Sequence, residues 1–124
     1  IVPVIDARKG QLYCASFSSA GGMLRRLSDD RLIDTDSLGE LIAGNSVLVG
    51  EASLLYKDLL EHNAGDSIIY SSYNLNYPRA SSLCFLSMQR VREGLAYDVY
   101  ALRPNYIRMS DAEIHRKERK SDER

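Results

Sequence analysis

The chain has 124 residues, of which 44% are hydrophobic, and its 16 basic and 17 acidic side chains give a formal charge of −1. This length fits one globular domain with a single core, and the balanced charge gives no general electrostatic reason to bind nucleic acid. No apolar run approaches the roughly 20 residues that a membrane span requires, and no stretch has the pattern of a signal peptide. We therefore expect a cytoplasmic protein without membrane contact.

Three β-strands are expected in the first third of the chain. An apolar run over residues 2–5 ends at Asp6 and is followed by turn-forming residues 7–10. Residues 11–18 alternate as in a strand with two partly apolar faces. Residues 23–33 form a third strand, which a bulge or bend interrupts. The short turns between these strands predict an antiparallel meander.

The pattern then changes to alternating helices and strands. Helical spacing of apolar residues predicts helices over 37–43, 52–62 and 80–95. Short apolar runs predict strands at 46–50 and 67–71, each buried on both faces. The order is therefore β-β-β-α-β-α-β-α, in which right-handed crossovers add parallel strands to the meander. This order predicts an α/β fold with a mixed sheet of the RNase H-like type, as found in each half of actin-like ATPases.

The cysteines and the C-terminal charges add two expectations. Cys14 and Cys84 lie far apart in apolar stretches without CxxC spacing, so we expect both to be buried, reduced thiols. Residues 115–124 carry five basic and three acidic side chains, which is typical of a solvated tail. The predicted domain accordingly spans residues 1–114.

The C-terminal segment before the tail contains three tyrosines, Tyr97, Tyr100 and Tyr106. Tyrosine is enriched at protein interfaces, so the segment could dock on a partner. Tyrosines near a chain end more often pack that end onto its own domain. We expect the second arrangement here.

Three motifs resemble those of a known family. Residues 4–13, VIDARKGQLY, are similar to the DAR-[RK]-G-x-[VL]-Y hairpin in the C-terminal half of TsaB-type (YeaZ-like) tRNA threonylcarbamoyladenosine biosynthesis proteins. Residues 47–52, VLVGEA, followed by Tyr56, resemble the strand-to-helix turn of that family, except that Ala52 stands in place of its second glycine. Residues 102–113, LRPNYIRMSDAE, resemble its P-x-Y-[LVI]-R-x-x-x-A-E ending. The motif residues with an expected structural or binding role are Asp6, Arg8, Gly10, Tyr13, Gly50, Glu51, Pro104, Tyr106, Arg108 and Glu113.

The resemblance implies a role in tRNA modification. TsaB-type proteins belong to the glycoprotease-like family and act with a catalytic paralogue of the same fold (TsaD-like) and a small ATPase (TsaE-like). Together they transfer a threonylcarbamoyl group to adenosine 37 of tRNA. For this chain, the resemblance implies a non-catalytic scaffold with no cofactor or metal, which contacts tRNA only indirectly. It is also compatible with a homodimer.

The beginning of the chain bears on its partners. The sequence opens with apolar strand residues and without methionine, so we expect it to be the C-terminal half of a longer protein. In the family that it resembles, the missing N-terminal half makes the main contact with the catalytic paralogue. The principal interface is therefore not expected on any residue of this chain.

Two catalytic alternatives remain open. Asp6 and Glu51 follow strands that are neighbours in an RNase H-like sheet, so their carboxylates are expected to approach each other as in metal-dependent phosphodiesterases. Asp6 is equally suited to accept hydrogen bonds from amides of its own turn. A glycoprotease-like peptidase is the other alternative, but His62 and His115 form no HExxH pair. The turn at residues 8–10 also lacks the spacing of a nucleotide phosphate loop.

Overall fold

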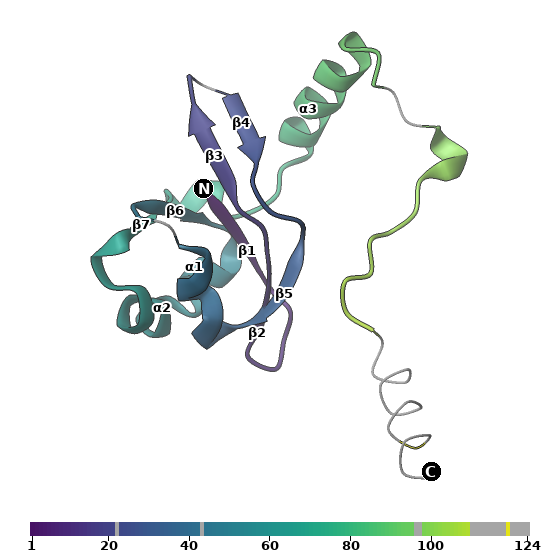
Figure 1. Cartoon of the computed structure of the whole chain (residues 1–124). Helices are drawn as coiled ribbons and strands as arrows, with labels where there is room; N and C mark the ends of the chain where they lie inside the picture. The colour runs from purple at the N-terminus through teal and green to yellow at the C-terminus, as the bar shows by residue number, and fades with distance from the viewer. Residues whose placement is uncertain (22, 43, 96–97, 110–118, 120–124) are drawn as a thin grey trace.

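The computed structural model describes residues 1–21, 23–42, 44–95, 98–109 and 119 (Figure 1). Its strands are β1 (Val2–Asp6), β2 (Gln11–Cys14), β3 (Phe17–Ala20), β4 (Met23–Arg26), β5 (Arg31–Asp34), β6 (Ser46–Val49) and β7 (Ile68–Tyr70). Its α-helices are α1 (Glu51–Leu55), α2 (Lys57–Ala64) and α3 (Ala80–Arg92), and its 3-10 helices are η1 (Thr35–Leu41), η2 (Gly65–Ser67), η3 (Tyr73–Leu75) and η4 (Val99–Ala101).

Five strands form one mixed sheet in the order β5-β2-β1-β6-β7. β1, β2 and β5 pair in antiparallel fashion, whereas β6 pairs in parallel with both β1 and β7. The expected contact between the first strand and the strand at residues 46–50 is present, with Val2 opposite Leu48. The α/β class and the mixed sheet are thus confirmed, and the RNase H-like assignment stays a prediction.

The second and third expected strands are each divided in two. β2 and β5 belong to the main sheet, whereas β3 and β4 form a separate two-stranded sheet. At the corner, the Ser16 amide donates to the Ser28 hydroxyl at 2.9 Å, and the Leu27 amide donates to the Ser16 carbonyl at 2.8 Å. The Ser28 side chain thus accepts the hydrogen bond that a backbone carbonyl of a neighbouring strand would accept in a regular sheet. Such side-chain bonds compete with strand pairing and end it locally. The expected interruption of the third strand lies at this corner.

The core lies on one face of the main sheet. Helices η1, α1 and α2 cover that face, which alternation along each strand makes apolar. The helix expected over residues 52–62 is divided into α1 and α2 at Tyr56, and the helix expected at 37–43 is the 3-10 helix η1. The buried core residues are Val2, Val4, Leu12, Cys14, Leu38, Leu48, Ala52 and Leu60.

Helix α3 occurs where the spacing predicts it, but the expected burial of its residue Cys84 is wrong. No residue of α3 is buried, and Leu83 and Val91 are 67% and 63% exposed. Cys84 is likewise exposed, whereas Cys14 is buried as expected. Figure 1 shows α3 standing away from the sheet. Helical periodicity fixes which side chains share a face, but burial also needs a partner surface, and the segment before α3 leads it away from the sheet.

The two thiols should therefore differ in reactivity. Burial raises the pKa of the Cys14 thiol, against a weaker opposing effect of Arg31. We expect iodoacetamide at pH 8 to modify Cys84 at least about ten-fold faster than Cys14 in the folded protein, because the thiolate is the reacting form. Peptide mass spectrometry over time measures both rates, and urea-unfolded protein should show nearly equal rates. Equal rates in the folded protein would contradict the burial of Cys14.

The C-terminal segment returns to the main sheet after η4. Tyr100 and Tyr106 are 88% and 84% exposed, so the expectation that they pack onto the domain is wrong. The polar and aliphatic neighbours of Tyr106 make the contacts instead, as described below. Tyr97, Glu113 and the charged tail, except for residue 119, lie outside the described residues. Within the described ranges, no helix is long and apolar enough to cross a membrane.

Candidate functional site

The turn that joins β1 and β2 is held by a closed set of hydrogen bonds. The Ala7 amide donates to the Gln11 carbonyl at 2.9 Å, and the Gln11 amide donates to the Arg8 carbonyl at 3.1 Å. The Arg8 amide donates to Asp6 Oδ1 at 2.9 Å, which is the turn-stabilising role expected of this aspartate. Gly10 is in the left-handed region with φ of 71°. The hairpin therefore presents its tip on a fixed backbone.

The turn between β6 and α1 depends on Gly50. Its φ is 120° and its ψ is 158°, a combination that only glycine adopts readily. A Cβ added at this position would lie 2.0 Å from the carbonyl oxygen of Val4 in β1. Gly50 thus permits close approach of the backbones of two neighbouring parallel strands.

Asn76 joins this turn to the segment before α3. Although the loop around it is exposed, Asn76 is only 1% exposed. Its Oδ1 accepts hydrogen bonds from the Gly50 amide at 2.9 Å and from the Ser71 hydroxyl at 2.7 Å. Its Nδ2 donates to the Ser72 carbonyl at 3.5 Å. One buried amide side chain therefore positions the ends of β6 and β7 relative to each other.

Replacing this amide should be costly. We expect Asn76→Ala to lower the free energy of unfolding by about 1–3 kcal/mol, because a buried donor is left unsatisfied. Urea unfolding followed by circular dichroism measures the change. Asn74→Ala, in the same loop but exposed, is the matched control and should stay within about 0.5 kcal/mol of the unaltered chain. Equal effects of the two substitutions would show that the Asn76 network does not hold in solution.

Asp6 and Glu51 lie at the same edge of the sheet, as the sequence predicts. Glu51 Oε1 accepts a hydrogen bond from the Asp6 amide at 3.3 Å. The Asp6 carboxylate accepts from the Tyr56 hydroxyl at 3.1 Å, and this bond raises the pKa of Tyr56 because it stabilises the neutral phenol beside a negative charge. Arg8 Nε lies 3.8 Å from Asp6 Oδ2. Both carboxylates are thus engaged with the groups that hold the two turns.

A metal site needs more ligands than this pair. In the ranges that the structure describes, no group of three or more His, Cys, Asp or Glu side chains is placed to hold a metal ion. His62 lies in the last turn of α2, where an imidazole interacts favourably with the helix dipole. His115 lies outside the described residues.

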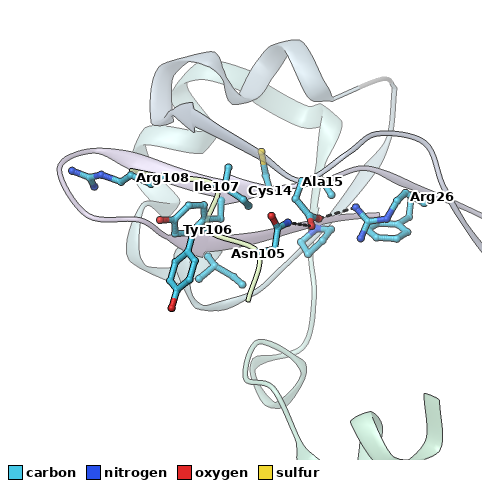
Figure 2. Close-up of a pocket in the computed structure, with 12 residues that line it drawn as sticks. Cys14, Ala15, Arg26, Asn105, Tyr106, Ile107 and Arg108 are labelled. Carbon is cyan, nitrogen blue, oxygen red and sulfur yellow. Dashed lines mark hydrogen bonds and ion pairs between the residues drawn. The ribbon is translucent and has the colours of Figure 1, made fainter. Parts of the chain in front are cut away.

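The C-terminal segment forms one wall of a groove on the other face of the sheet (Figure 2). The groove has a volume of about 430 Å³. Its floor is apolar, and Asp30 at its rim accepts hydrogen bonds from Arg26 at 2.7 Å and Asn105 at 3.2 Å. The bond from Arg26 is the main cause that lowers the pKa of Asp30. The lining residues are Pro3, Ile5, Tyr13, Cys14, Ala15, Phe17, Arg26, Asp30, Asn105, Tyr106, Ile107 and Arg108.

Arg108 ties the C-terminal motif to the hairpin motif. Its Nη1 donates a hydrogen bond of 2.8 Å to the carbonyl of Ala7, across 101 residues of sequence. Figure 2 shows the Arg108 side chain extending away from the labelled groove residues toward one end of the sheet. Two of the three motifs that carry the family resemblance therefore meet in space.

Six of the ten predicted site residues fall into two groups. Asp6, Gly50 and Glu51 lie where β1 and β6 end, and Tyr13, Tyr106 and Arg108 line the groove. Arg8 and Gly10 belong to the hairpin turn next to the first group. Pro104 is exposed before the groove segment, and Glu113 lies outside the described residues.

Sequence reasoning missed Asn76, and it named Tyr56 as part of a family motif without its contact to Asp6. Asn76 stands in a polar, tyrosine-rich loop, and nothing in its neighbourhood distinguishes it from Asn74. Tyr56 is part of the helical apolar spacing, so its hydroxyl contact with Asp6 is hidden by its contribution to the core. Both depend on contacts between segments more than 20 residues apart.

Comparison with known proteins gives one clear similarity. No protein-family model matches the chain. Over 116 residues, or 91% of the chain, it is 28% identical to the tRNA threonylcarbamoyladenosine biosynthesis protein TsaB of Bacillus subtilis (strain 168). The chain spans about half of that relative, covering 49% of its length. This similarity supports a TsaB-like relationship over nearly all of the chain.

Proposed function

We propose that this chain serves in the biosynthesis of threonylcarbamoyladenosine in tRNA, as part of a TsaB-like protein. The observation that carries the proposal is the 28% identity to Bacillus subtilis TsaB over 91% of the chain. The contact between Arg108 and Ala7 adds support, because it joins the hairpin and C-terminal motifs on which the resemblance rests. The sheet order β5-β2-β1-β6-β7 also suits the RNase H-like fold that the resemblance implies.

In this proposal the chain is a scaffold and not the catalyst. The acidic pair at the end of β1 is used to hold the fold, since Glu51 binds the Asp6 amide and Asp6 binds Tyr56 and its own turn. A catalytic carboxylate needs access to a metal or substrate, and these contacts compete with such access. The transfer itself would then belong to a TsaD-like paralogue, assisted by a TsaE-like ATPase.

A domain replacement tests the proposal. The part of Bacillus subtilis TsaB that this chain matches is exchanged for the chain, in cells depleted of their own TsaB. We expect the chimera to restore threonylcarbamoyladenosine, measured by mass spectrometry of nucleosides from digested tRNA. A chimera carrying Gly50→Val is the control for folding and should fail. A well-folded chimera that leaves the modified nucleoside absent would contradict the proposal.

Activity assays on the chain itself distinguish the scaffold proposal from the two catalytic alternatives. Asp6→Ala with Glu51→Ala removes the acidic pair, and cleavage of RNA and DNA is measured with Mn²⁺ or Mg²⁺. Metal-dependent cleavage by the unaltered chain that the double variant lacks would favour a phosphodiesterase. Hydrolysis of a peptide or glycoprotein substrate would favour the peptidase alternative. Neither activity is expected.

A further inference from the structure

The β1–β2 turn holds two basic residues in a backbone conformation that side chains rarely adopt. Arg8 and Lys9 have φ of 64° and 56°, and Gly10 follows at 71°. A residue with a Cβ is strained in the left-handed region, which glycine occupies freely. Glycine at both positions would thus suit the fold better than arginine and lysine. Strain of this kind is concentrated at functional sites, which makes these two side chains candidates for a binding role.

The strained turn cannot relax easily. The Ala7 and Gln11 backbones are bonded across the hairpin, and the Thr35 amide donates to the Gly10 carbonyl at 2.9 Å. The turn is therefore fixed on both sides, by its own hairpin and by the start of η1. Its side chains project from a rigid support, which lowers the entropy lost when they bind a ligand.

A third cation lies at the same turn. Arg108 donates to the Ala7 carbonyl at 2.8 Å, which places its guanidinium beside the turn. The Arg8 side chain is 87% exposed, whereas that of its ion-pair partner Asp6 is 12% exposed. Asp6 is further held by the Tyr56 hydroxyl and the Arg8 amide. The nearby Asp34 carboxylate accepts a hydrogen bond from the side-chain amide of Gln11. Arg8 and Lys9 are exposed at the tip, whereas the neighbouring carboxylates of Asp6 and Glu51 are partly buried. The outermost charged side chains of the tip are therefore cationic, although the whole chain has a charge of −1.

We propose that this basic turn, formed by Arg8, Lys9 and Arg108, binds the phosphate backbone of RNA. The inference deepens the proposed function, on which it rests for the identity of that RNA as tRNA, and it replaces the indirect contact with tRNA that the family resemblance implies by a direct one. Guanidinium groups bind phosphate in a bidentate manner, and lysine adds a point charge. Arg8 and Lys9 stand on the exposed tip, and Arg108 lies between this tip and the groove, so the three cations do not converge on one small site. That arrangement suits successive phosphates of a polymer better than one free phosphate ion.

Binding of a tRNA transcript, measured by fluorescence anisotropy at several salt concentrations, tests the inference. The variant Arg8→Gly with Lys9→Gly removes two charges and also relieves the strain. We expect it to bind at least about ten-fold more weakly at 50 mM salt, and the slope of log K against log salt to become about 1.5 shallower. Its melting temperature should be unchanged or higher. If the glycine variant is more stable but binds tRNA more weakly, the strained residues Arg8 and Lys9 serve binding and not folding.

The matched control is Arg90→Ala with Arg92→Ala, which removes the same charge from the far helix α3. It should leave tRNA affinity nearly unchanged. The inference is overturned if the unaltered chain does not bind tRNA, or if both double variants lose affinity equally. It is also overturned if inorganic phosphate alone binds the turn with sub-millimolar affinity in calorimetry, because the site would then serve a free ion.

The chimera with Bacillus subtilis TsaB keeps the two proposals apart. If the chimera restores threonylcarbamoyladenosine but the glycine variant binds tRNA as well as the parent chain, only the RNA contact fails. If the chimera is inactive while the glycine variant loses tRNA binding, only the pathway assignment fails. The unaltered chain is used in both assays.

Discussion

Gly50→Ala is expected to lower the free energy of unfolding by about 3–5 kcal/mol, because two separate costs add at this residue. The first is the backbone conformation, with φ of 120°. The second is steric, since the new Cβ would lie 2.0 Å from the Val4 carbonyl oxygen. That oxygen belongs to the backbone of the central strand β1, so it cannot move aside without disturbing the pairing of β1 with β6. Urea unfolding followed by circular dichroism measures the loss.

Gly10→Ala separates the two costs. Gly10 also has a positive φ, of 71°, but a Cβ there meets nothing within 4 Å. Its substitution should therefore cost only the conformational part, about 1–2 kcal/mol. The difference between the two variants then measures the steric contact together with the larger conformational cost at Gly50. If Gly50→Ala were no more destabilising than Gly10→Ala, the close approach of β1 and the β6–α1 turn would not exist in solution.

The sequence pattern predicts the central part of the fold because that part rests on local signals. The apolar runs at residues 2–5 and 46–50 indicate strands, and both occur with the expected pairing. The parallel pairing of β1 with β6 also explains why Asp6 and Glu51 lie close together, at the C-terminal ends of these two strands. These residues are therefore placed correctly before any side-chain contact is known.

The rest depends on contacts between distant segments, which a local pattern does not contain. The strand expected over residues 11–18 breaks because Ser16 bonds to the Ser28 side chain. The buried position of Asn76 follows from its bond to the Gly50 amide, 26 residues away. The position of Arg108 at the hairpin needs a contact across 101 residues. Sequence reasoning could name Arg108 through the family motif but could not place it.

Helix α3 shows the limit of periodicity most directly, and a pair of leucine substitutions tests its position. Leu60 in α2 is 1% exposed, and Leu86 in α3 is 55% exposed. We expect Leu60→Ala to lower the free energy of unfolding by about 2–5 kcal/mol, because it leaves a cavity in the core. Leu86→Ala should change it by no more than about 0.5 kcal/mol. Both substitutions remove the same atoms from a helix, so helix propensity does not explain the difference.

Chemical unfolding of the two variants beside the unaltered chain decides between two arrangements of α3. A small effect of Leu86→Ala supports a helix that stands free of the sheet, as Figure 1 shows. A loss above about 1.5 kcal/mol would mean that α3 packs against an apolar surface in solution. The sheet face opposite the core offers such a surface, because Ile5 and Ile69 on it are 47% and 49% exposed. Repeating Leu86→Ala at two protein concentrations would then show whether that surface belongs to the same chain, since only a contact between chains depends on concentration.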